Sequence, residues 1–280
     1  MAPQIFLALF IAQTHASAPR LDGHETPLTV YAVKSSSGCA PLALISHGAG
    51  GSENGYAYLA QALADNGFTA IVMGHRESGL AALRSDIQGS GIGPGVRELV
   101  ENTSAETARL LDVTAALKFA EASCKPPFRV LLGHSMGAIT VMMEAGARNI
   151  IHVAAPPAAQ DRFDAYVALS PEGPGIAFSE HAWNGIRKPM LILTGTRDQS
   201  LKGGPQARQI PFRDLPGIAS ECQWMGAIDG ATHMNFGGRG PGADRVKPMV
   251  TTTVTNFLKG VRGPGCLLPP ATAGMTLQAK

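Results

Sequence analysis

The stretch that decides the fold is Leu131-Leu-Gly133-His134-Ser135-Met136-Gly137, in which a short apolar run leads into the motif G-x-S-x-G. Residues 128–132 have the composition of a buried strand, and residues 138–145 have the pattern of a helix. A serine on a tight strand-to-helix turn needs flanking glycines, because the turn has no room for neighbouring Cβ atoms. The pattern predicts a nucleophile elbow with Ser135 as nucleophile. The alternative, in a chain with 33 glycines, is a structural turn.

The composition fits one large domain. The 280 residues are 45% hydrophobic and 16% charged, which is enough apolar material for a single core. The 23 basic and 21 acidic residues are spread without a run of like charge, which argues against a nucleic-acid partner. No Cys or His spacing matches a metal site, and no nucleotide-binding motif is present, so no metal and no cofactor are expected.

Short apolar runs alternate with longer amphipathic runs along the chain. The apolar runs predict strands at residues 28–33, 42–46, 69–73, 128–132, 166–169, 190–194 and 223–228. The amphipathic runs predict helices at residues 56–66, 104–123 and 248–259. Strands separated by helices form parallel βαβ units, so we expect an α/β fold with a mainly parallel central sheet flanked by helices on both faces. Residues 77–102, rich in Gly and Ser, are predicted to be a long loop over the carboxyl edge of the sheet.

Both ends of the chain carry patterns of their own. Residues 1–18 join a short apolar run to a small-x-small ending, which predicts a signal peptide, although the first residues lack Lys and Arg. The alternative is a buried N-terminal segment. Residues 19–262 would then be a single domain, and residues 263–280 an extended or disordered tail. The signal-peptide pattern predicts a secreted or periplasmic protein, and no segment is long and apolar enough to span a membrane.

Four cysteines, Cys39, Cys124, Cys222 and Cys266, fit an oxidising compartment. Cys39 and Cys124 each lie just ahead of a predicted strand. If these strands are parallel neighbours, both thiols lie at one edge of the sheet, so a disulfide between them is geometrically reasonable. The second pair could then join the tail to the domain. The alternative is four reduced, buried thiols.

A serine hydroxyl needs a base within hydrogen-bond reach, and the base needs an acid that orients it. Asp198 follows the predicted strand 190–194 after a glycine turn, and His233 lies in the loop after the strand 223–228. The chain order Ser135, Asp198, His233, each after its own strand, is the order typical of α/β-hydrolases. Taken singly, Asp198 could be a solvated turn residue and His233 a cap or loop residue.

The glycine-rich segment His47-Gly48-Ala49-Gly50-Gly51 directly follows the predicted strand 42–46. Acyl transfer places negative charge on a carbonyl oxygen, and backbone N–H groups aimed at that oxygen stabilise it. We expect the N–H of Ala49, or alternatively that of Gly50, to act together with the N–H of Met136. A phosphate-binding loop is the alternative, but the lysine and the spacing of nucleotide-binding motifs are missing.

Residues 25–260 resemble the α/β-hydrolase superfamily, in particular secreted bacterial esterases similar to dienelactone hydrolases and platelet-activating-factor acetylhydrolases. The resemblance is carried by LISHGAGGS (44–52), GYAYLA (55–60), GHSMG (133–137) and GATH (230–233). It implies a triad of Ser135, Asp198 and His233. Dienelactone hydrolases use a cysteine nucleophile, so the resemblance concerns the fold rather than the substrate. Some of these acetylhydrolases take their acid from the preceding strand, which makes Glu172 a rival to Asp198.

The sequence therefore predicts a secreted carboxylesterase-type serine hydrolase that forms an acyl-enzyme. Because no sizeable helical lid is predicted, short-chain or aryl esters, or a polyester, are expected as substrates rather than long triglycerides. The alternatives are a serine peptidase or amidase of the same fold and a non-catalytic binding protein. Loop positions after strands suggest the pocket residues His75, Arg76, Glu172, Trp183 and Met234. Nothing in the sequence indicates the oligomeric state.

Overall fold

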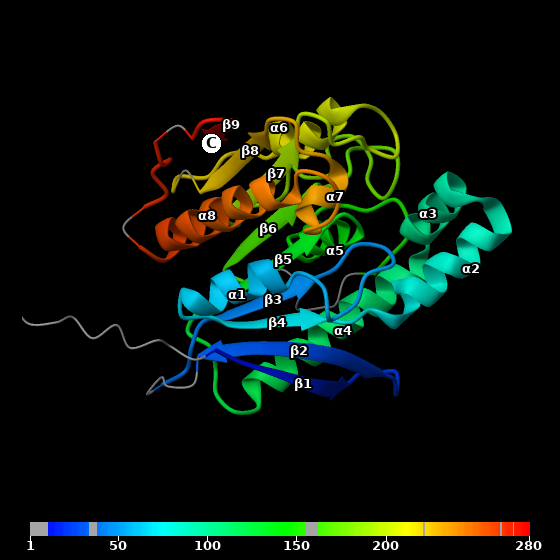
Figure 1. The fold of residues 1–280 in the computed structure, drawn as a ribbon, viewed down its shortest axis with the longest axis horizontal. Coiled ribbons are helices and arrows are strands. Elements are labelled where there is room, and N and C mark those ends of the chain that lie inside the picture. The colour runs from blue at the N-terminus through cyan, green and yellow to red at the C-terminus, as the bar shows by residue number, and fades with distance from the viewer. Residues whose placement is uncertain (1–10, 34–37, 155–161, 221, 264, 271) are drawn as a thin grey trace, which may run out of the picture.

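A mixed sheet forms the centre of the protein in the computed structural model, which describes residues 11–33, 38–154, 162–220, 222–263, 265–270 and 272–280. Within these residues the sheet has nine strands in the order β1-β2-β4-β3-β5-β6-β7-β8-β9 (Figure 1). The strands are β1 (Ile11–Pro19), β2 (Glu25–Val33), β3 (Leu42–Ser46), β4 (Thr69–Met73), β5 (Arg129–His134), β6 (Ala165–Leu169), β7 (Met190–Gly195), β8 (Gln223–Ile228) and β9 (Met275–Ala279). The strands from β4 to β8 in this order run parallel, whereas β1, β2 and β9 join the edges in antiparallel fashion.

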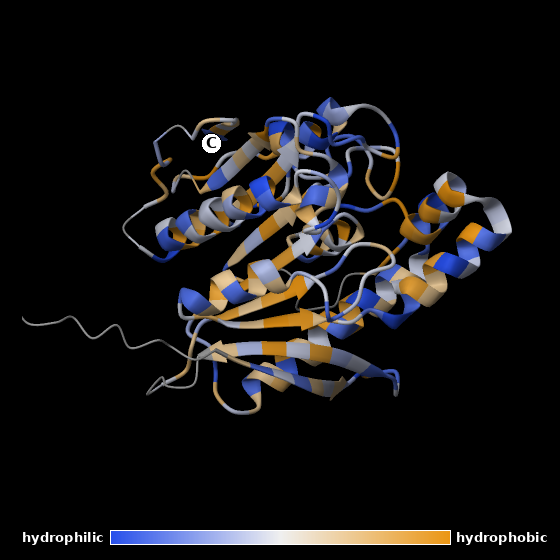
Figure 2. Cartoon of the chain, in the orientation of Figure 1, coloured by the Kyte–Doolittle hydropathy of each residue, from blue (hydrophilic) through white to orange (hydrophobic). Residues whose placement is uncertain are grey.

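Helices cover both faces of the sheet. They are α1 (Ala57–Asp65), α2 (Leu80–Ser90), α3 (Ile92–Glu101), α4 (Thr103–Glu121), α5 (Met136–Glu144), α6 (Ile210–Asp214), α7 (His233–Phe236) and α8 (Ala243–Arg262), with the 3-10 helices η1 (Arg76–Ser78) and η3 (Pro205–Gln209). Helices α1 and α8 pack in one apolar cluster, and α4 and α5 pack in another on the opposite face. Figure 2 shows the apolar strands between these two layers. The predicted fold class is confirmed.

The central strands are apolar along their whole length because helices bury both of their faces. Every residue of β3, β6 and β7 is buried. The arrowheads of the parallel strands in Figure 1 point toward the side from which α2 and α3 project. This carboxyl edge is where side chains that follow the strands come together, as in other open α/β sheets.

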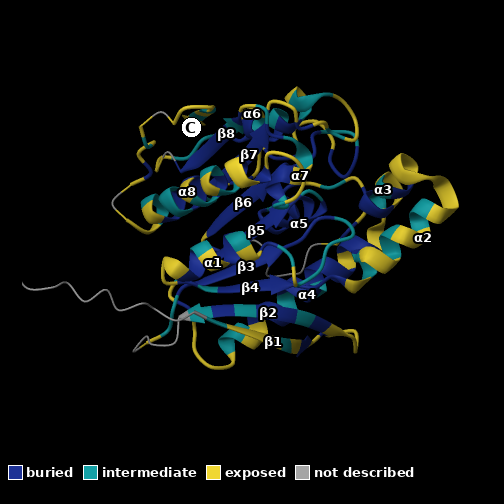
Figure 3. Cartoon of the chain, in the orientation of Figure 1, coloured by how far each residue is buried: buried dark blue, intermediate teal, exposed yellow. Residues whose placement is uncertain are grey.

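The segment predicted to be a long loop, residues 77–102, is instead a helical hairpin made of α2 and α3. Figure 3 shows α2 as largely exposed, and none of its residues is buried. Gly91 separates the two helices with a φ of 88°, a conformation that favours glycine. The glycines that suggested a loop therefore end one helix and allow the next to begin. The expectation that the chain lacks a helical lid is wrong, since this hairpin lies at the carboxyl edge.

The N-terminal strand conflicts with the predicted end of the signal peptide. All nine residues of β1 pair with β2, and Ala18 is fully buried. Cleavage after Ala18 would remove this strand from the sheet, so the fold favours a boundary before Ile11. Residues 1–10 of the predicted signal peptide lie outside the described residues. In the described part of the chain, no helix is long and apolar enough to cross a membrane.

The predicted tail is not wholly irregular, because β9 pairs with β8 and closes the far edge of the sheet. Two disulfides tie distant segments together. Cys39 and Cys124, with Cα atoms 5.8 Å apart, join the segments that precede the neighbouring strands β3 and β5. Cys222 and Cys266, with Cα atoms 5.1 Å apart, join the start of β8 to the segment after α8. Both pairings agree with the expectation from the sequence.

Candidate active site

Ser135 lies on a strained turn between β5 and α5. Its φ of 58° and ψ of −120° are unfavourable for a residue with a side chain, and such strain is concentrated at functional sites. A Cβ on Gly133 would overlap the carbonyl of Gly137, and a Cβ on Gly137 would overlap the carbonyl of Ser46 in β3. The two glycines are therefore required by the close approach of β5, α5 and β3. Local geometry of this kind is that of a nucleophile elbow.

Ser135, His233 and Asp198 are brought together by the carboxyl ends of β5, β8 and β7. Nε2 of His233 lies 2.9 Å from Oγ of Ser135, and its Nδ1 lies 3.2 Å from Oδ1 of Asp198. His233 is the first residue of α7, whose start is fixed by a capping box between Thr232 and Asn235. The imidazole is 29% exposed, whereas Asp198 is fully buried. Hydroxyl, imidazole and carboxylate thus form one continuous chain that opens to solvent at the serine end.

Ser170 also belongs to this chain, and the sequence analysis missed it. Its Oγ lies 2.7 Å from Nδ1 of His233, closer than the carboxylate of Asp198. The Ser170 hydroxyl also hydrogen bonds to Asp198, so it donates to the carboxylate and accepts from the imidazole N–H. The position directly after β6 was visible in the sequence, but a serine at a strand end is not a recognised triad member.

The Asp198 carboxylate is buried and ionised. Burial raises the pKa of this carboxyl group. The hydrogen bond with His233 and the charge of Arg208 lower it by more than burial raises it, so the pKa lies below its ordinary value. Thr194 donates a hydrogen bond to Oδ2 at 2.9 Å. Oδ1 also forms a 2.7 Å ion pair with Nε of Arg208. An ionised acid in this place can hold the imidazole in one tautomer and stabilise its protonated form.

Glu172, the rival acid, has other partners. Its Oε1 pairs with Nη2 of Arg208 at 3.0 Å, and its Oε2 accepts hydrogen bonds from Ser200 Oγ and Leu201 N. Asp198 is the carboxylate that contacts His233 within the described part of the chain. Of the two candidates, the geometry therefore favours Asp198.

The glycine-rich loop lies against Ser135. A Cβ added to Gly48 would lie 3.1 Å from the Ser135 Cβ, so the loop and the elbow are in contact. The N–H of Gly50 donates to the carbonyl of Ser78 at 2.9 Å and is occupied. The backbone N–H groups of Ala49 and Met136 donate to no acceptor among the described residues. Of the two loop candidates, Ala49 is therefore the better donor for an oxyanion.

Two buried histidines hold this loop in place. Nδ1 of His47 donates to the carbonyl of Gly48 at 2.7 Å, and its Nε2 accepts from the backbone N–H of His75 at 3.0 Å. Arg109 donates to the carbonyl of His47 at 2.7 Å, and Asp112 lies 2.8 Å from His75 Nδ1. Burial holds the pKa of both histidines well below the ordinary value. They are neutral and fix the loop.

His134 fixes the base in a similar way. Its Nδ1 lies 2.7 Å from the hydroxyl of Tyr56, and its Nε2 lies 3.0 Å from the backbone carbonyl of His233. Burial first, and then the nearby His233, hold the pKa of His134 well below its ordinary value. His134 is thus a neutral packing residue that holds the start of α7.

The residues suggested as pocket residues do not converge on one pocket. Trp183 is fully buried and donates its Nε1–H to Sδ of Met142, so its assignment to the pocket is wrong. It packs in the apolar cluster that also contains Phe178 and Ala182. Met234 is 50% exposed beside His233. His75 and Arg76 help to line a surface cavity of about 380 Å³ that also includes Gly51 of the glycine-rich loop.

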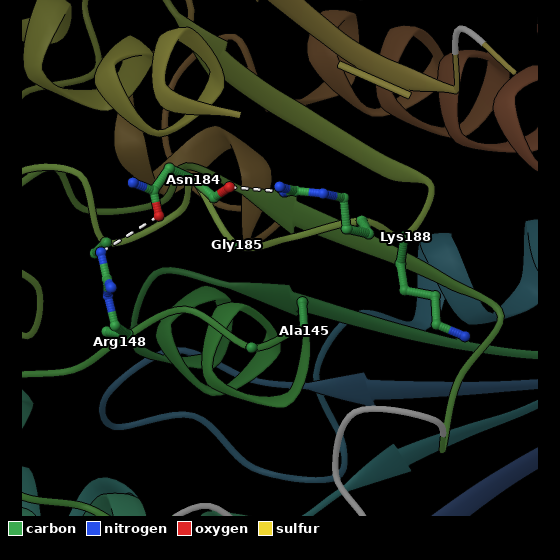
Figure 4. A pocket seen from close by; sticks show the side chains of 8 residues that line it. Ala145, Arg148, Asn184, Gly185 and Lys188 are labelled. Carbon is green, nitrogen blue, oxygen red and sulfur yellow. Dashed lines mark hydrogen bonds between the residues drawn. The ribbon is translucent and has the colours of Figure 1, made fainter. Parts of the chain in front are cut away.

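A separate cavity of about 430 Å³ lies at the amino-terminal edge of the sheet, away from the triad (Figure 4). It is lined by Ala145, Gly146, Arg148, Ala182, Asn184, Gly185, Arg187 and Lys188. Asn184 accepts a hydrogen bond from Arg148 on its side chain and one from Arg187 on its backbone carbonyl. No triad residue lines this cavity, so the candidate site is the carboxyl edge.

Comparisons with known proteins agree with this geometry. Residues 40–155 match the family model of hydrolases described as serine aminopeptidase, S33. A structure from Klebsiella pneumoniae subsp. pneumoniae MGH 78578, assigned as a dienelactone hydrolase, superposes with a TM-score of 0.64 at 16% identity, covering 89% of this chain and 99% of that one. Est1E from Butyrivibrio proteoclasticus superposes with a TM-score of 0.59 at 15% identity, covering 87% of this chain and 98% of its own. No curated protein sequence matches the chain. The chain therefore has the α/β-hydrolase fold, and its residues 40–155 are similar to a family of hydrolases.

Proposed function

We propose that this hydrolase is a serine carboxylic-ester hydrolase in which Ser135, His233 and Asp198 act as the triad. The observation that supports the proposal is the continuous chain from Ser135 Oγ through the His233 imidazole to Asp198. His233 Nε2 takes the Ser135 proton while Oγ attacks the ester carbonyl carbon. The N–H groups of Ala49 and Met136 stabilise the oxyanion that forms.

The remaining steps return the catalyst to its starting state. The tetrahedral intermediate collapses, its C–O bond to the leaving group breaks, and His233 gives its proton to the departing alkoxide. Water then attacks the acyl-enzyme and passes its proton to the same imidazole. The acid product leaves after Ser135 Oγ takes the proton back. Throughout, Asp198 stays ionised and stabilises the imidazolium.

Covalent labelling separates an active hydrolase from a binding protein that has only the fold. We expect a fluorophosphonate probe to label the folded protein and the label to be lost in Ser135→Ala. Ser179→Ala, which changes an exposed serine outside the site, serves as the matched control and should label like the wild type. Folded wild-type protein that takes no label would support the binding protein instead.

An amidase or peptidase is the second candidate, because the matching family model is described as serine aminopeptidase, S33. The same triad can cleave amides, but it must then protonate an amine leaving group. A panel of p-nitrophenyl esters and peptide anilides distinguishes the two activities. We expect turnover of the esters, whereas turnover of the anilides alone would establish the second candidate.

Short-chain or aryl esters are the proposed substrates. A polyester contains the same ester bond and belongs to the same proposed class. The cavity of about 380 Å³ beside the glycine-rich loop includes Gly51 but no triad residue, so the proposal rests on the accessible position of the triad, whose imidazole is 29% exposed, and not on the volume of that cavity. The α2–α3 hairpin borders it, since Leu80 and Ala81 line the same cavity. We expect activity to fall as the acyl chain lengthens from butyrate to decanoate in a p-nitrophenyl ester series. Hydrolysis of olive oil that exceeds butyrate cleavage would overturn this substrate class.

Secretion or periplasmic export is part of the proposal, and the two disulfides support an oxidising compartment. We expect cell fractionation to find the protein outside the cytoplasm, with no free thiols before reduction. The N-terminal sequence of that protein should begin at or before Ile11, because β1 belongs to the sheet. A chain that begins at residue 19 would instead confirm the boundary predicted from the sequence.

A further inference from the structure

Arg208, on the 3-10 helix η3, uses its whole guanidinium group to join the loops that carry the triad acid. Its Nε pairs with Oδ1 of Asp198 at 2.7 Å. Its Nη1 donates to the carbonyls of Ser170 and Pro171 at 2.8 and 2.9 Å. Its Nη2 donates to the carbonyl of Gln199 and forms a 3.0 Å ion pair with Glu172. All donors of the planar fork are thus engaged.

The three charges in this cluster are withdrawn from solvent. The side chains of Arg208, Asp198 and Glu172 are 1%, 0% and 3% exposed. One cation and two carboxylates leave a net negative charge beside the imidazole, and burial reduces the screening of that charge. Among the described residues, the ring of His134 also faces His233, with ring centroids 4.8 Å apart, and His134 is neutral.

We propose that Arg208 is a positioning residue that aims Asp198 at His233, and that Glu172 balances its charge so that the imidazole can still accept the serine proton. The inference rests on the proposed function of Ser135, His233 and Asp198. Without Arg208, the buried Asp198 carboxylate would lose a charged partner and its link to the loop after β6. Without Glu172, the charge of Arg208 would be balanced by Asp198 alone, so less negative charge would remain to stabilise a protonated His233.

The two charge changes act in opposite directions on the pH dependence of catalysis. Removing the Arg208 cation favours the protonated form of the Asp198–His233 pair, so the acid limb of the kcat/KM profile should move to higher pH. Replacing Glu172 by Gln removes a negative charge and leaves the cation in place. The imidazolium is then less stable, so the acid limb should move to lower pH. A role confined to folding would not give shifts of opposite sign.

The experiment compares pH profiles of kcat and KM for p-nitrophenyl acetate in Arg208→Met, Arg208→Lys and Glu172→Gln. An arginine typically lowers the pKa of an adjacent carboxylate by about 1–3 units, and the acid limb reports the imidazole one group further away, so we expect the acid limb of Arg208→Met to rise by about 0.5–1 pH unit. Glu172→Gln should lower it by a smaller amount. Arg208→Lys keeps the charge but loses the fork, so its limb should stay near that of the wild type while kcat falls roughly tenfold. Arg213→Met, an exposed neighbour, is the matched control.

Several outcomes separate this inference from the proposed function. If wild-type protein neither turns over esters nor takes a fluorophosphonate label at Ser135, the proposed function fails. If the wild type is active but Arg208→Met and Glu172→Gln keep its pH profile, the role of Arg208 is refuted. Should Arg208→Met not fold, Glu172→Gln and Arg208→Lys still decide the matter. A shift of Glu172→Gln to higher pH would overturn the charge argument.

Discussion

Gly137→Ala tests how the elbow and the oxyanion loop depend on one close contact. Gly137 lies in the first turn of α5, directly above the end of β3. A Cβ there would overlap the carbonyl oxygen of Ser46 and lie 2.7 Å from its carbonyl carbon and 2.9 Å from the carbonyl oxygen of His47. Ordinary contacts begin at 3.4 Å, so the carbonyl carbon alone requires a separation of about 0.7 Å, and the overlap with the carbonyl oxygen of Ser46 requires more. All three contacts are to backbone, which cannot rotate away.

The displacement falls between the two proposed oxyanion donors. Met136 precedes Gly137 on the helix, and Ala49 follows His47 on the loop after β3. A misplacement near 1 Å can cost about 100-fold in rate, so we expect kcat/KM for p-nitrophenyl acetate to fall by roughly that factor. Overpacking of this kind should also lower the free energy of unfolding by about 1–3 kcal/mol.

The control is Gly89→Ala on the exposed helix α2, where an added Cβ meets no atom within 4 Å. Alanine is favoured over glycine inside a helix by about 1 kcal/mol or less, so this variant should be as stable as the wild type or slightly more stable. Its kcat/KM should be unchanged. Urea unfolding and steady-state kinetics check both variants. Wild-type kcat/KM in a folded Gly137→Ala protein would refute the packing argument.

Three further predictions concern the acid, one disulfide and a buried carboxyl. Asp198→Asn should lower kcat roughly 10³- to 10⁴-fold, as loss of the orienting acid does in serine hydrolases. Glu172→Gln should lower kcat less than tenfold at the pH optimum. If steady-state kinetics gave the reverse order, Glu172 would be the acid. Replacing both Cys39 and Cys124 by Ser removes a disulfide between residues 85 positions apart and should lower the free energy of unfolding, measured in urea, by about 2–4 kcal/mol. An unchanged free energy of unfolding would exclude a stabilising role for this disulfide. Burial raises the pKa of Glu106 to about 7, so its contribution to stability is present below about pH 4.5 and is lost as pH rises through 7. Glu106→Gln should flatten this part of the stability profile, and an unchanged slope would contradict the assignment.

The layout of the fold followed from hydrophobic patterning, since buried parallel strands are short and continuously apolar. The run 42–46 and the run 223–228 coincide with β3 and β8. Edge strands gave weaker patterns, because polar residues alternate with apolar ones in β1 and β9. Residues 77–102 were mistaken for a loop, because both helices contain glycines and α2 buries none of its residues; the apolar face of α3, which buries Leu99 and Val100, was overlooked.

Positions after strands identified the residues that meet at the carboxyl edge. Ser135, Asp198 and His233 could be proposed from the sequence because each follows its own buried strand. Arg208 could not, since it lies on a short 3-10 helix and its role depends on contacts with two distant loops. Trp183 shows the opposite error, since a loop position after a strand does not reveal whether a side chain points into the core.

The most direct test of the central claim is the trapping of an acyl-enzyme. Wild-type protein is mixed rapidly with p-nitrophenyl acetate, quenched in acid within the first turnover, digested and analysed by mass spectrometry. We predict a burst of p-nitrophenolate equal to the number of active sites and one acetyl group on the peptide that carries Ser135. Ester turnover with no acetyl group on Ser135 would contradict the assignment of Ser135 as the nucleophile.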